Sequence, residues 1–377
     1  MDKEINIKSF DFQYYEELRN FISTYWREDH PVVKSDALFR WQYYGYGQLR
    51  GYENFQLLFD ADKLIGFRAV IPLEIQISHN KDTKVETCMG SAMWMVSPDY
   101  RGMGLGYKIH HNTENASDAS LAIGANWKTS VPLYLRSGYH EIKRFNRYIM
   151  PLSYDYTYLL KCQCDASCLD GWIPSFEGLP LVVENDDVRE LAEVWKASTM
   201  GVEMIALHRS EEYWKWRYIE SPIFKYHIFG GKEAGGIVVA RIEKAIGVEK
   251  DGIKVLRIIE AIPYSSNIWK YERDETFELL LKYVVNWGQN EGCAAADFHC
   301  TTNKLYPSFR NIGFVEQPLN FEPAMLSLSD FFQPVEKSVH HFNGYLRLAD
   351  KHANESFNYE NTYFVRSDTD QDRVNII

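Results

Sequence analysis

Short apolar runs alternate with polar turns along the chain, and the same order of runs occurs in both halves. Each half begins this pattern with an aromatic segment, residues 39–43 in the first and 214–218 in the second. Short apolar runs bounded by turn residues predict β-strands that pair as hairpins. The runs are residues 54–60 and 64–73 in the first half, and residues 226–229 and 236–242 in the second.

One offset relates the two halves. Trp41 and Trp216 are 175 positions apart (216 − 41), and so are Gly138 and Gly313 (313 − 138) near the ends of the halves. Agreement at two separated landmarks predicts a tandem duplication. We expect each half to be an α/β unit made of hairpin strands, a long helix, a strand and a short helix.

The connecting region is rich in glycine and proline between residues 171 and 180, so we place the domain boundary there. The predicted domains are residues 1–150 and 183–335, joined by a linker at 151–182. Residues 336–377 form a C-terminal extension, and its charged end at 366–373 is expected to be frayed.

A glycine-rich loop follows the most apolar run of the first half. Met89 to Val96 predicts a buried strand, the next four residues break it, and Arg101 to Gly106 reads Arg-Gly-Met-Gly-Leu-Gly before a segment with helical potential. A strand, a glycine loop and a helix together direct backbone N–H groups and a helix dipole at an anionic phosphate. Glycine suits such a loop because a Cβ would keep phosphate oxygens away from the N–H groups.

Two other phosphate loops do not fit this segment. A dinucleotide loop requires Gly-x-Gly-x-x-Gly, but its third glycine would fall on Tyr107 or Ile109. A nucleotide-binding loop of the Walker type ends in Gly-Lys-Ser/Thr, which is absent here. The remaining alternative is a glycine-rich turn without a ligand.

Composition and charge narrow the class of protein. A chain of 377 residues with 45% hydrophobic residues fits two folded domains, and a net charge of −11 argues against a nucleic-acid partner. We expect no membrane span and no signal peptide, because no apolar run approaches about 20 residues and the N-terminus is charged. A cytoplasmic protein with six free thiols follows. We expect no metal, because Cys162, Cys164 and Cys168 lack paired knuckle spacing and a nearby histidine.

Two segments carry a resemblance to a known family. Val96 to Gly106 resembles the signature of the GNAT superfamily of N-acetyltransferases, and Leu133 to Tyr139 resembles its later Leu-Tyr-x-x-x-Gly-Phe segment. The match covers about residues 55 to 145, whereas the second half matches only in its ends. The resemblance implies two tandem GNAT-like acyl-CoA N-acyltransferase domains of the α/β (α+β) class. Each would have a mixed, mostly antiparallel central sheet flanked by helices.

The resemblance also implies roles for residues of the first half, with acyl-CoA (acetyl-CoA or hydroxyacyl-CoA) as co-substrate. The backbone of the strand end would pair with the pantetheine arm, the loop would hold the pyrophosphate, and Asn126 would lie near the pantetheine. Tyr134 would protonate the departing thiolate, and its alternative role is that of a packed helix residue. The implied strand-end and loop residues are Trp94, Met95, Val96, Arg101, Gly102, Met103, Gly104, Leu105 and Gly106.

The second half lacks a glycine loop and a tyrosine at the matching positions. Phe309 stands opposite Tyr134 at the 175 offset, and the segment after Pro263 contains no glycine where the loop would fall. We therefore expect the second half to bind the acceptor or to serve a structural role.

An amine acceptor must lose a proton before or during attack on a thioester, so a basic side chain is sought. His30 lies in a loop-like segment, and the alternative is a turn or capping histidine. Glu260 is a carboxylate inside an apolar strand, which is either functional or part of an internal network. Asp297 and His299 share one strand face, and they either bind acceptor hydroxyls or form an internal polar pair.

The acceptor is inferred from a further resemblance. The motifs Trp-x-x-x-His-Pro and Phe-x-Trp-Gln-Tyr, with a degenerate second repeat, resemble tandem acyltransferases of surface-polysaccharide pathways. They imply a nucleotide-linked amino sugar, such as a dTDP-3-amino-3,6-dideoxyhexose, bound near Trp41 and Tyr43. Lys215, Arg217 and Lys225 would meet the diphosphate. The alternatives are an aminoacyl or peptidoglycan-type amine, or a non-catalytic acyl-CoA-binding module; a homodimer is compatible with either.

Direct attack on the thioester is expected rather than a covalent acyl-enzyme on Cys88 or Cys300. A nucleophilic thiol needs a basic neighbour, and His299 would point to the opposite strand face from Cys300.

Overall fold

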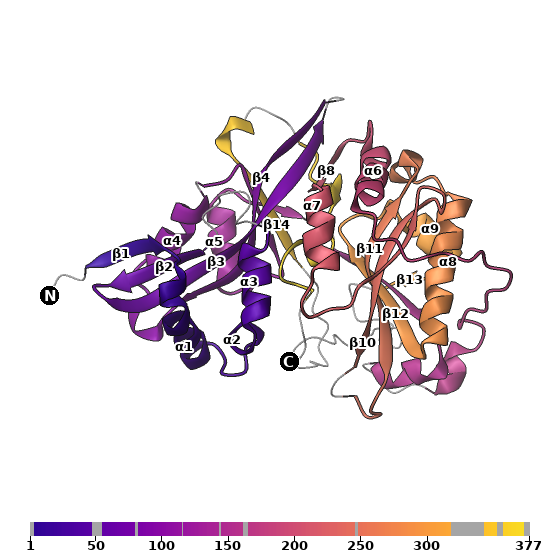
Figure 1. Ribbon diagram of the computed structural model, residues 1–377, viewed down its shortest axis with the longest axis horizontal. Helices are drawn as coiled ribbons and strands as arrows, with labels where there is room; N and C mark the ends of the chain where they lie inside the picture. The colour runs from indigo at the N-terminus through magenta and orange to yellow at the C-terminus, as the bar shows by residue number, and fades with distance from the viewer. Residues whose placement is uncertain are drawn as a thin grey trace.

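The computed structural model describes residues 4–46, 55–79, 82–114, 116–142, 145–160, 165–245, 248–317, 343–352 and 357–372. They form two mixed sheets side by side, each flanked by helices (Figure 1). This arrangement confirms the predicted fold class. We call the first sheet with α1 to α5 the first unit, and the second sheet with α6 to α9 the second unit.

The first sheet has the strand order β1-β2-β3-β4-β5-β14-β6, and β8 and β15 extend it from β3. Its neighbours pair antiparallel, except for the parallel pairs β4–β5 and β8–β15. The strands are β1 (Ile5–Ser9), β2 (Phe55–Asp60), β3 (Lys63–His79), β4 (Asp82–Val96), β5 (Ala119–Ile123), β6 (His140–Ile142), β8 (Met204–Leu207), β14 (Gly344–Leu348) and β15 (Thr362–Tyr363).

Helices cover both faces of the first sheet. Buried residues of α1 recur at helical spacing, as Leu18, Phe21 and Ile22 do, and they join the same core cluster as Met93 of β4. Ile109 of α4 packs in a separate cluster on the opposite face. The helices are α1 (Tyr15–Tyr25), α2 (Pro31–Lys34) and α3 (Asp36–Tyr44) on one face, and α4 (Leu105–Glu114) and α5 (Ser130–Arg136) on the other.

The second sheet repeats the order of elements seen in the first, with the strand order β13-β7-β12-β11-β10-β9. In both units a hairpin is followed by a strand, a helix, a parallel strand and a short helix. The second unit contains β7 (Asn146–Pro151), β9 (His227–Gly231), β10 (Gly236–Lys244), β11 (Lys254–Pro263), β12 (Cys293–Cys300), β13 (Val315–Glu316), α6 (Val188–Thr199), α7 (Glu211–Trp214), α8 (Glu275–Asn290) and α9 (Tyr306–Asn311).

Each sheet contains strands from the other half of the chain: β7 joins the second sheet, and β8, β14 and β15 join the first. β7 follows the first unit in sequence but lies between β12 and β13 of the second sheet. β14 follows the second unit in sequence but lies between β5 and β6 of the first sheet. A boundary at residue 150 therefore falls inside β7, and residues 344–348 of the expected extension are part of the first sheet. Cutting the chain in the expected linker would separate β7 from the second sheet, and β8, β14 and β15 from the first.

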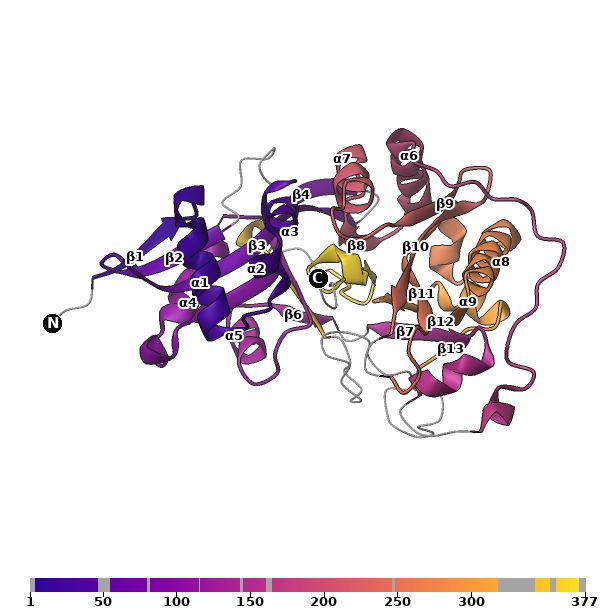
Figure 2. The same cartoon turned by 60° about the horizontal axis from the view of Figure 1, so that its bottom comes forward.

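The end of the chain is buried, which corrects the expectation of a frayed segment at 366–373. Its described part, residues 366–372, lies between the two units (Figure 2). Asp368 is fully buried and pairs with Arg209 at 2.7 Å, and Asp372 pairs with Arg241 at 2.8 Å. Charged side chains can be buried when they are paired, so the polar composition of the tail was a poor guide to its exposure.

Two further expectations concern cysteines and membranes. Cys168 is disulfide-bonded, which corrects the expectation of six free thiols, whereas Cys88, Cys293 and Cys300 are free and buried. Cys162 and Cys164 lie outside the described residues. The closeness of Cys162, Cys164 and Cys168 in sequence was weighed only as a possible metal site and not as a possible disulfide. Within the described ranges, no helix has the length and apolarity to cross a membrane.

Candidate active site

The two parallel strands at the centre of the first sheet diverge. β4 and β5 pair only from Cys88 opposite Ala119 to Gly90 opposite Leu121. Beyond Gly90, β4 continues to Val96, and no strand of the described chain pairs with that side of it. The backbone from Ser91 to Val96 thus offers hydrogen-bonding groups to a ligand, as a sheet edge does. Trp94, Met95 and Val96, predicted to contact pantetheine, lie on this edge.

The glycine loop lies at the end of the same strand. Gly102 and Gly104 have φ values of 80° and 73°, a left-handed conformation that glycine adopts without strain. A Cβ at either position would meet open space, so backbone conformation, rather than crowding by the protein, requires these glycines. α4 begins at Leu105 with no acidic residue in its first turn, and Arg101 beside it is exposed. The helix dipole and one guanidinium can therefore attract an anion here.

Tyr134 lies where the strands begin to diverge. It is buried on α5, and its hydroxyl is 2.9 Å from the Ser91 Oγ, one residue beyond the last β4–β5 pair. Asn126 is exposed, and its side-chain oxygen accepts hydrogen bonds from the N–H groups of Lys128 and Thr129. Asn126 therefore shapes the turn that leads into α5, and its contact with pantetheine stays a prediction.

A buried polar cluster behind Tyr134 was missed by sequence reasoning. Arg68 donates to Ser91 at 3.0 Å and lies 3.8 Å from Glu114. His110 contacts Glu114 at 3.4 Å, and Tyr139 also donates to Glu114. A charged residue inside an apolar strand is a signal that the sequence offers, and Arg68 carries it. Sequence reasoning used this signal for Glu260 only. The partners come from distant segments, so their meeting requires the fold.

Burial dominates the electrostatics of this cluster. It lowers the pKa of His110 to about 2, assisted by the nearby positive charge of Arg68, so His110 is neutral. Burial also raises the pKa of Glu114, although Arg68 and the Tyr139 hydrogen bond oppose this shift.

A small pocket on the opposite face of the sheet brings together three predicted residues, His30, Trp41 and Tyr43. Met93 of β4 and Phe224 of the second unit also line it. The pocket has a volume of about 60 Å³, and the tail supplies Asp370 and Asp372 to its lining. The His30 Nδ1 accepts a hydrogen bond of 3.4 Å from the Val32 N–H, so His30 caps α2 while it lines the pocket.

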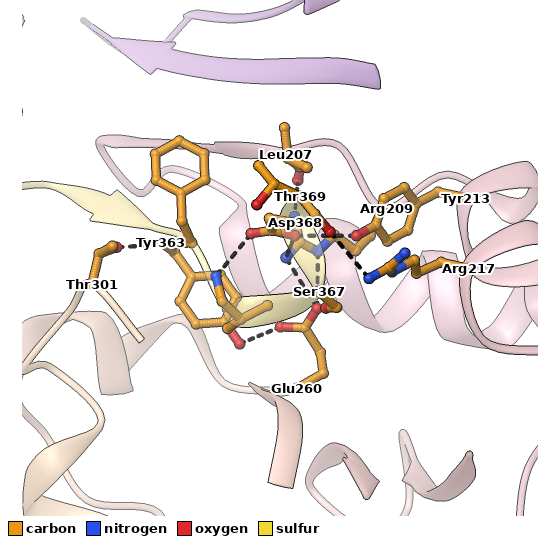
Figure 3. Close-up of polar contacts among 12 residues, drawn as sticks. Leu207, Arg209, Tyr213, Arg217, Glu260, Thr301, Tyr363, Ser367, Asp368 and Thr369 are labelled. Atoms are coloured by element: carbon orange, nitrogen blue, oxygen red, sulfur yellow. Dashed lines mark hydrogen bonds and ion pairs between the residues drawn. The ribbon is translucent and has the colours of Figure 1, made fainter. Parts of the chain in front are cut away.

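Glu260 is a structural residue, which corrects its assignment as a base. It is fully buried and lies 3.0 Å from Arg209, which also pairs with Asp368 (Figure 3). The hydroxyls of Tyr218 and Tyr363 donate to the same carboxylate. Glu260 does not line the pocket that His30, Trp41 and Tyr43 form. A carboxylate saturated by internal donors cannot reach an acceptor amine.

Asp297 and His299 are also internal, which corrects their expected contact with an acceptor. Both are buried, and Asp297 accepts hydrogen bonds of 3.0 and 2.7 Å from Arg147. Burial would raise the pKa of Asp297, but Arg257 and Arg147 outweigh it and hold this pKa well below its usual range. Arg147 lies opposite His299 on β7, the neighbouring strand of the same sheet, so its guanidinium occupies the face that Asp297 and His299 share.

The basic residues expected at a diphosphate are divided. Arg217 is buried, donates to the Thr369 carbonyl at 3.2 Å and lies over the Trp41 ring. It is therefore part of the interior, which corrects its expected role. Lys215 is exposed and pairs with Glu220, whereas Lys225 lines a second pocket of about 540 Å³ that shares Phe224 with the first.

In the second unit the corresponding divergence is filled by the chain itself. β11 and β12 pair from Lys254 opposite Cys293 to Ile258 opposite Phe298 and then separate. The Tyr363 hydroxyl accepts a hydrogen bond of 3.2 Å from the Ala261 N–H, and Val365 bridges to Cys300. These contacts occupy the gap between β11 and β12, whereas the matching gap beside β4 is open in the first unit.

The N-terminus of the corresponding helix is also closed to an anion. The Asp274 carboxylate caps α8 by accepting hydrogen bonds from the N–H groups of Thr276 and Phe277. Glu275 and Glu278 add negative charge to the first turn. Phe309, which stands opposite Tyr134, is buried in the core. Only the first unit therefore combines an open helix end with an open strand edge among the described residues.

Comparison with known proteins places the fold. No protein-family profile and no curated protein sequence matches the chain. A GCN5-related N-acetyltransferase from Kribbella flavida superposes with a TM-score of 0.56 and 12% identity over 93% of this chain and 72% of that one. A GCN5-related N-acetyltransferase from Anabaena variabilis ATCC 29413 superposes with a TM-score of 0.53 and 14% identity over 92% of this chain and 73% of that one. Saccharomyces cerevisiae N-myristoyltransferase with bound myristoyl-CoA superposes with a TM-score of 0.51 and 10% identity over 92% of this chain and 83% of that one.

These matches span both units, so the chain has the fold of the GCN5-related N-acetyltransferases. The same two-unit arrangement is shared with an N-myristoyltransferase. Identities of 10 to 14% establish the fold, and the chemistry must be argued from the site.

Proposed function

We propose that the protein is an acyl-CoA-dependent N-acyltransferase whose first unit binds the donor. The observation that carries this proposal is the contrast between the units. The first has an open β4 edge next to a glycine loop and a helix N-terminus without acidic residues. The second has both places occupied by Tyr363 and Asp274. A pyrophosphate at the loop and a pantetheine arm along β4 fit the first unit.

Transfer proceeds by direct attack of an amine on the thioester carbonyl. A C–N bond forms, the C–S bond breaks, and its electron pair remains on sulfur. Tyr134 then gives its hydroxyl proton to the sulfur, and the nitrogen loses one proton to solvent or a base such as His30. Burial raises the pKa of Cys88 and Cys300, so neither is a thiolate suited to form an acyl-enzyme.

We propose a nucleotide-linked amino sugar, such as a dTDP-3-amino-3,6-dideoxyhexose, as the acceptor. The pocket beside Met93 has aromatic lining from Trp41, Tyr43 and Phe224, which suits a sugar ring, and Asp370 can attract its amine. The adjoining larger pocket offers room for the nucleotide, with Lys225 near the diphosphate. Because the smaller pocket has carboxylates and no Lys or Arg in its lining, an aminoacyl amine is the second candidate.

The test is release of free thiol from acetyl-CoA and 3-hydroxyacyl-CoA with a panel of amines, followed by mass spectrometry of the products. An N-acylated nucleotide sugar would support the proposal. Turnover with aminoacyl amines alone would replace the acceptor. Binding of coenzyme A with no turnover on any amine would favour a binding module, and absence of binding would refute the whole assignment.

A further inference from the structure

Three buried side chains form a continuous polar chain behind the site of thioester cleavage. The Arg68 Nη2 lies 3.0 Å from the Ser91 Oγ, and the Ser91 Oγ lies 2.9 Å from the Tyr134 hydroxyl. Arg68, Ser91 and Tyr134 come from β3, β4 and α5, and each is less than a tenth exposed. Arg68 is fixed in place by Glu114 at 3.8 Å and by the Trp94 ring at 4.9 Å.

The chemistry of these groups sets the direction of the hydrogen bonds. A guanidinium only donates, so Ser91 accepts from Arg68. Arg68 and Tyr134 are the only partners of the Ser91 hydroxyl among the residues with described positions. Since an unpaired buried hydroxyl proton is costly, Ser91 donates its proton to the Tyr134 oxygen. The proton of Tyr134 is then left for another acceptor.

The chain of hydroxyls is confined to the unit with the glycine loop. In the second unit, Val239 and Ile258 stand at the positions that match Arg68 and Ser91 across the strand irregularity, and both are apolar. The neighbouring Glu260 belongs to a different network, with Tyr218 and Tyr363. The irregularity in the first unit lies between Arg68 and Val70. In the second unit, Phe309 stands at the position that matches Tyr134. The chain of Arg68, Ser91 and Tyr134 thus has no counterpart at the matching positions of the second unit, Val239, Ile258 and Phe309.

We propose that Ser91 and Arg68 are positioning residues that direct the Tyr134 proton towards the departing sulfur and stabilise the phenolate that remains. This inference rests on the proposed function. When the C–S bond breaks, the electron pair goes to sulfur and the Tyr134 proton follows it. The phenolate keeps the Ser91 hydrogen bond, polarised by the Arg68 charge, until it regains a proton from solvent, which balances the single proton that the nitrogen releases to solvent or a base.

Kinetics of Ser91→Ala and Ser91→Thr with the amine that the wild type accepts test this inference. We expect Ser91→Ala to lower kcat about tenfold with an unchanged Kd for coenzyme A, because one orienting hydrogen bond is lost. Ser91→Thr should restore most of kcat because it keeps the hydroxyl. Ser198→Ala is the matched control, since Ser198 is a buried serine that accepts from Trp269 in the second unit.

Two readouts separate positioning from a merely structural effect. In a Tyr134→Phe background, Ser91→Ala should have no further effect on kcat, because Ser91 acts through the Tyr134 hydroxyl. An acyl thioester of a strongly acidic thiol should reduce the kcat defect of Ser91→Ala, because its thiolate leaves without protonation. Additive losses, or equal losses with both donors, would overturn the inference. A wild type that releases no thiol with any amine would instead be a failure of the proposed function.

Discussion

Trp41 and Trp216 exchange reciprocal hydrogen bonds across the junction of the two units. Each indole N–H donates to the backbone carbonyl of the other residue at 2.7 Å, and the rings lie 5.6 Å apart. The two residues are separated by the 175-residue offset of the duplication. Equivalent residues that contact each other define an approximate two-fold axis, as in a symmetric dimer. The duplication is thus retained in space as well as in sequence.

Replacing Trp41 by Phe should lower the free energy of unfolding by about 1 kcal/mol more than a change of ring size alone, because one hydrogen bond of the pair is lost. Urea denaturation measures this loss. Trp214→Phe is the control, because the Trp214 indole N–H is buried without a hydrogen-bond partner in the described structure. Equal destabilisation by both substitutions would show that the reciprocal hydrogen bonds contribute nothing.

Gly104→Ala should weaken coenzyme A binding by at least about tenfold, because an alanine there costs about 1–2 kcal/mol in the left-handed conformation and the loop will shift. Calorimetry measures the change in Kd. Gly201→Ala is matched to it, since Gly201 has a φ of 70° and also faces open space, but lies after α6 of the second unit. Similar affinities for the two variants would exclude the loop from donor binding.

The buried His110 should make the protein sensitive to mild acid. Its pKa is lowered to about 2 in the folded state, chiefly by burial, so the folded protein stays unprotonated where the unfolded chain, with a pKa of about 6.5, takes up a proton. The free energy of unfolding therefore falls as the pH falls below about 6.5, by up to about 1.4 kcal/mol per pH unit.

Urea denaturation of wild type and His110→Gln across this pH range tests the His110 contribution. The variant should lose part of the slope, whereas His111→Gln, at an exposed neighbouring position, should keep it. An unchanged slope in His110→Gln would mean that His110 does not remain neutral in the folded protein.

Glu260→Gln should affect stability and spare catalysis. The substitution leaves Arg209 with one carboxylate partner in place of two, and disrupting a buried ion pair costs about 3–5 kcal/mol. We expect a lower melting temperature with kcat unchanged at temperatures where the variant is folded. A large fall in kcat without loss of stability would return Glu260 to the catalytic machinery.

Local patterns predicted the parts of the fold that depend on neighbours in sequence. The apolar run before Arg101 and the glycines after it predict a strand, a loop and a helix, because each preference acts within a few residues. The repeated spacing likewise predicted two similar units. A short motif next to Gly138 likewise predicted the short helix that carries Tyr134.

Long-range pairing was beyond these patterns. Nothing local in the sequence indicates that β7 and β14 each belong to the sheet of the other unit. Glu260 and Asp297 were misassigned for a related reason: a carboxylate in an apolar strand has the same sequence pattern whether it faces a ligand or a guanidinium. Their partners, Arg209 and Arg147, lie 51 and 150 positions away.

The number of coenzyme A molecules bound per chain tests the central claim most directly. The open β4 edge and the unblocked α4 terminus occur in the first unit, whereas Tyr363 and Asp274 occupy the matching places in the second. Native mass spectrometry at saturating coenzyme A, supported by calorimetry, should give one molecule per chain. Two molecules per chain, or none, would contradict the account.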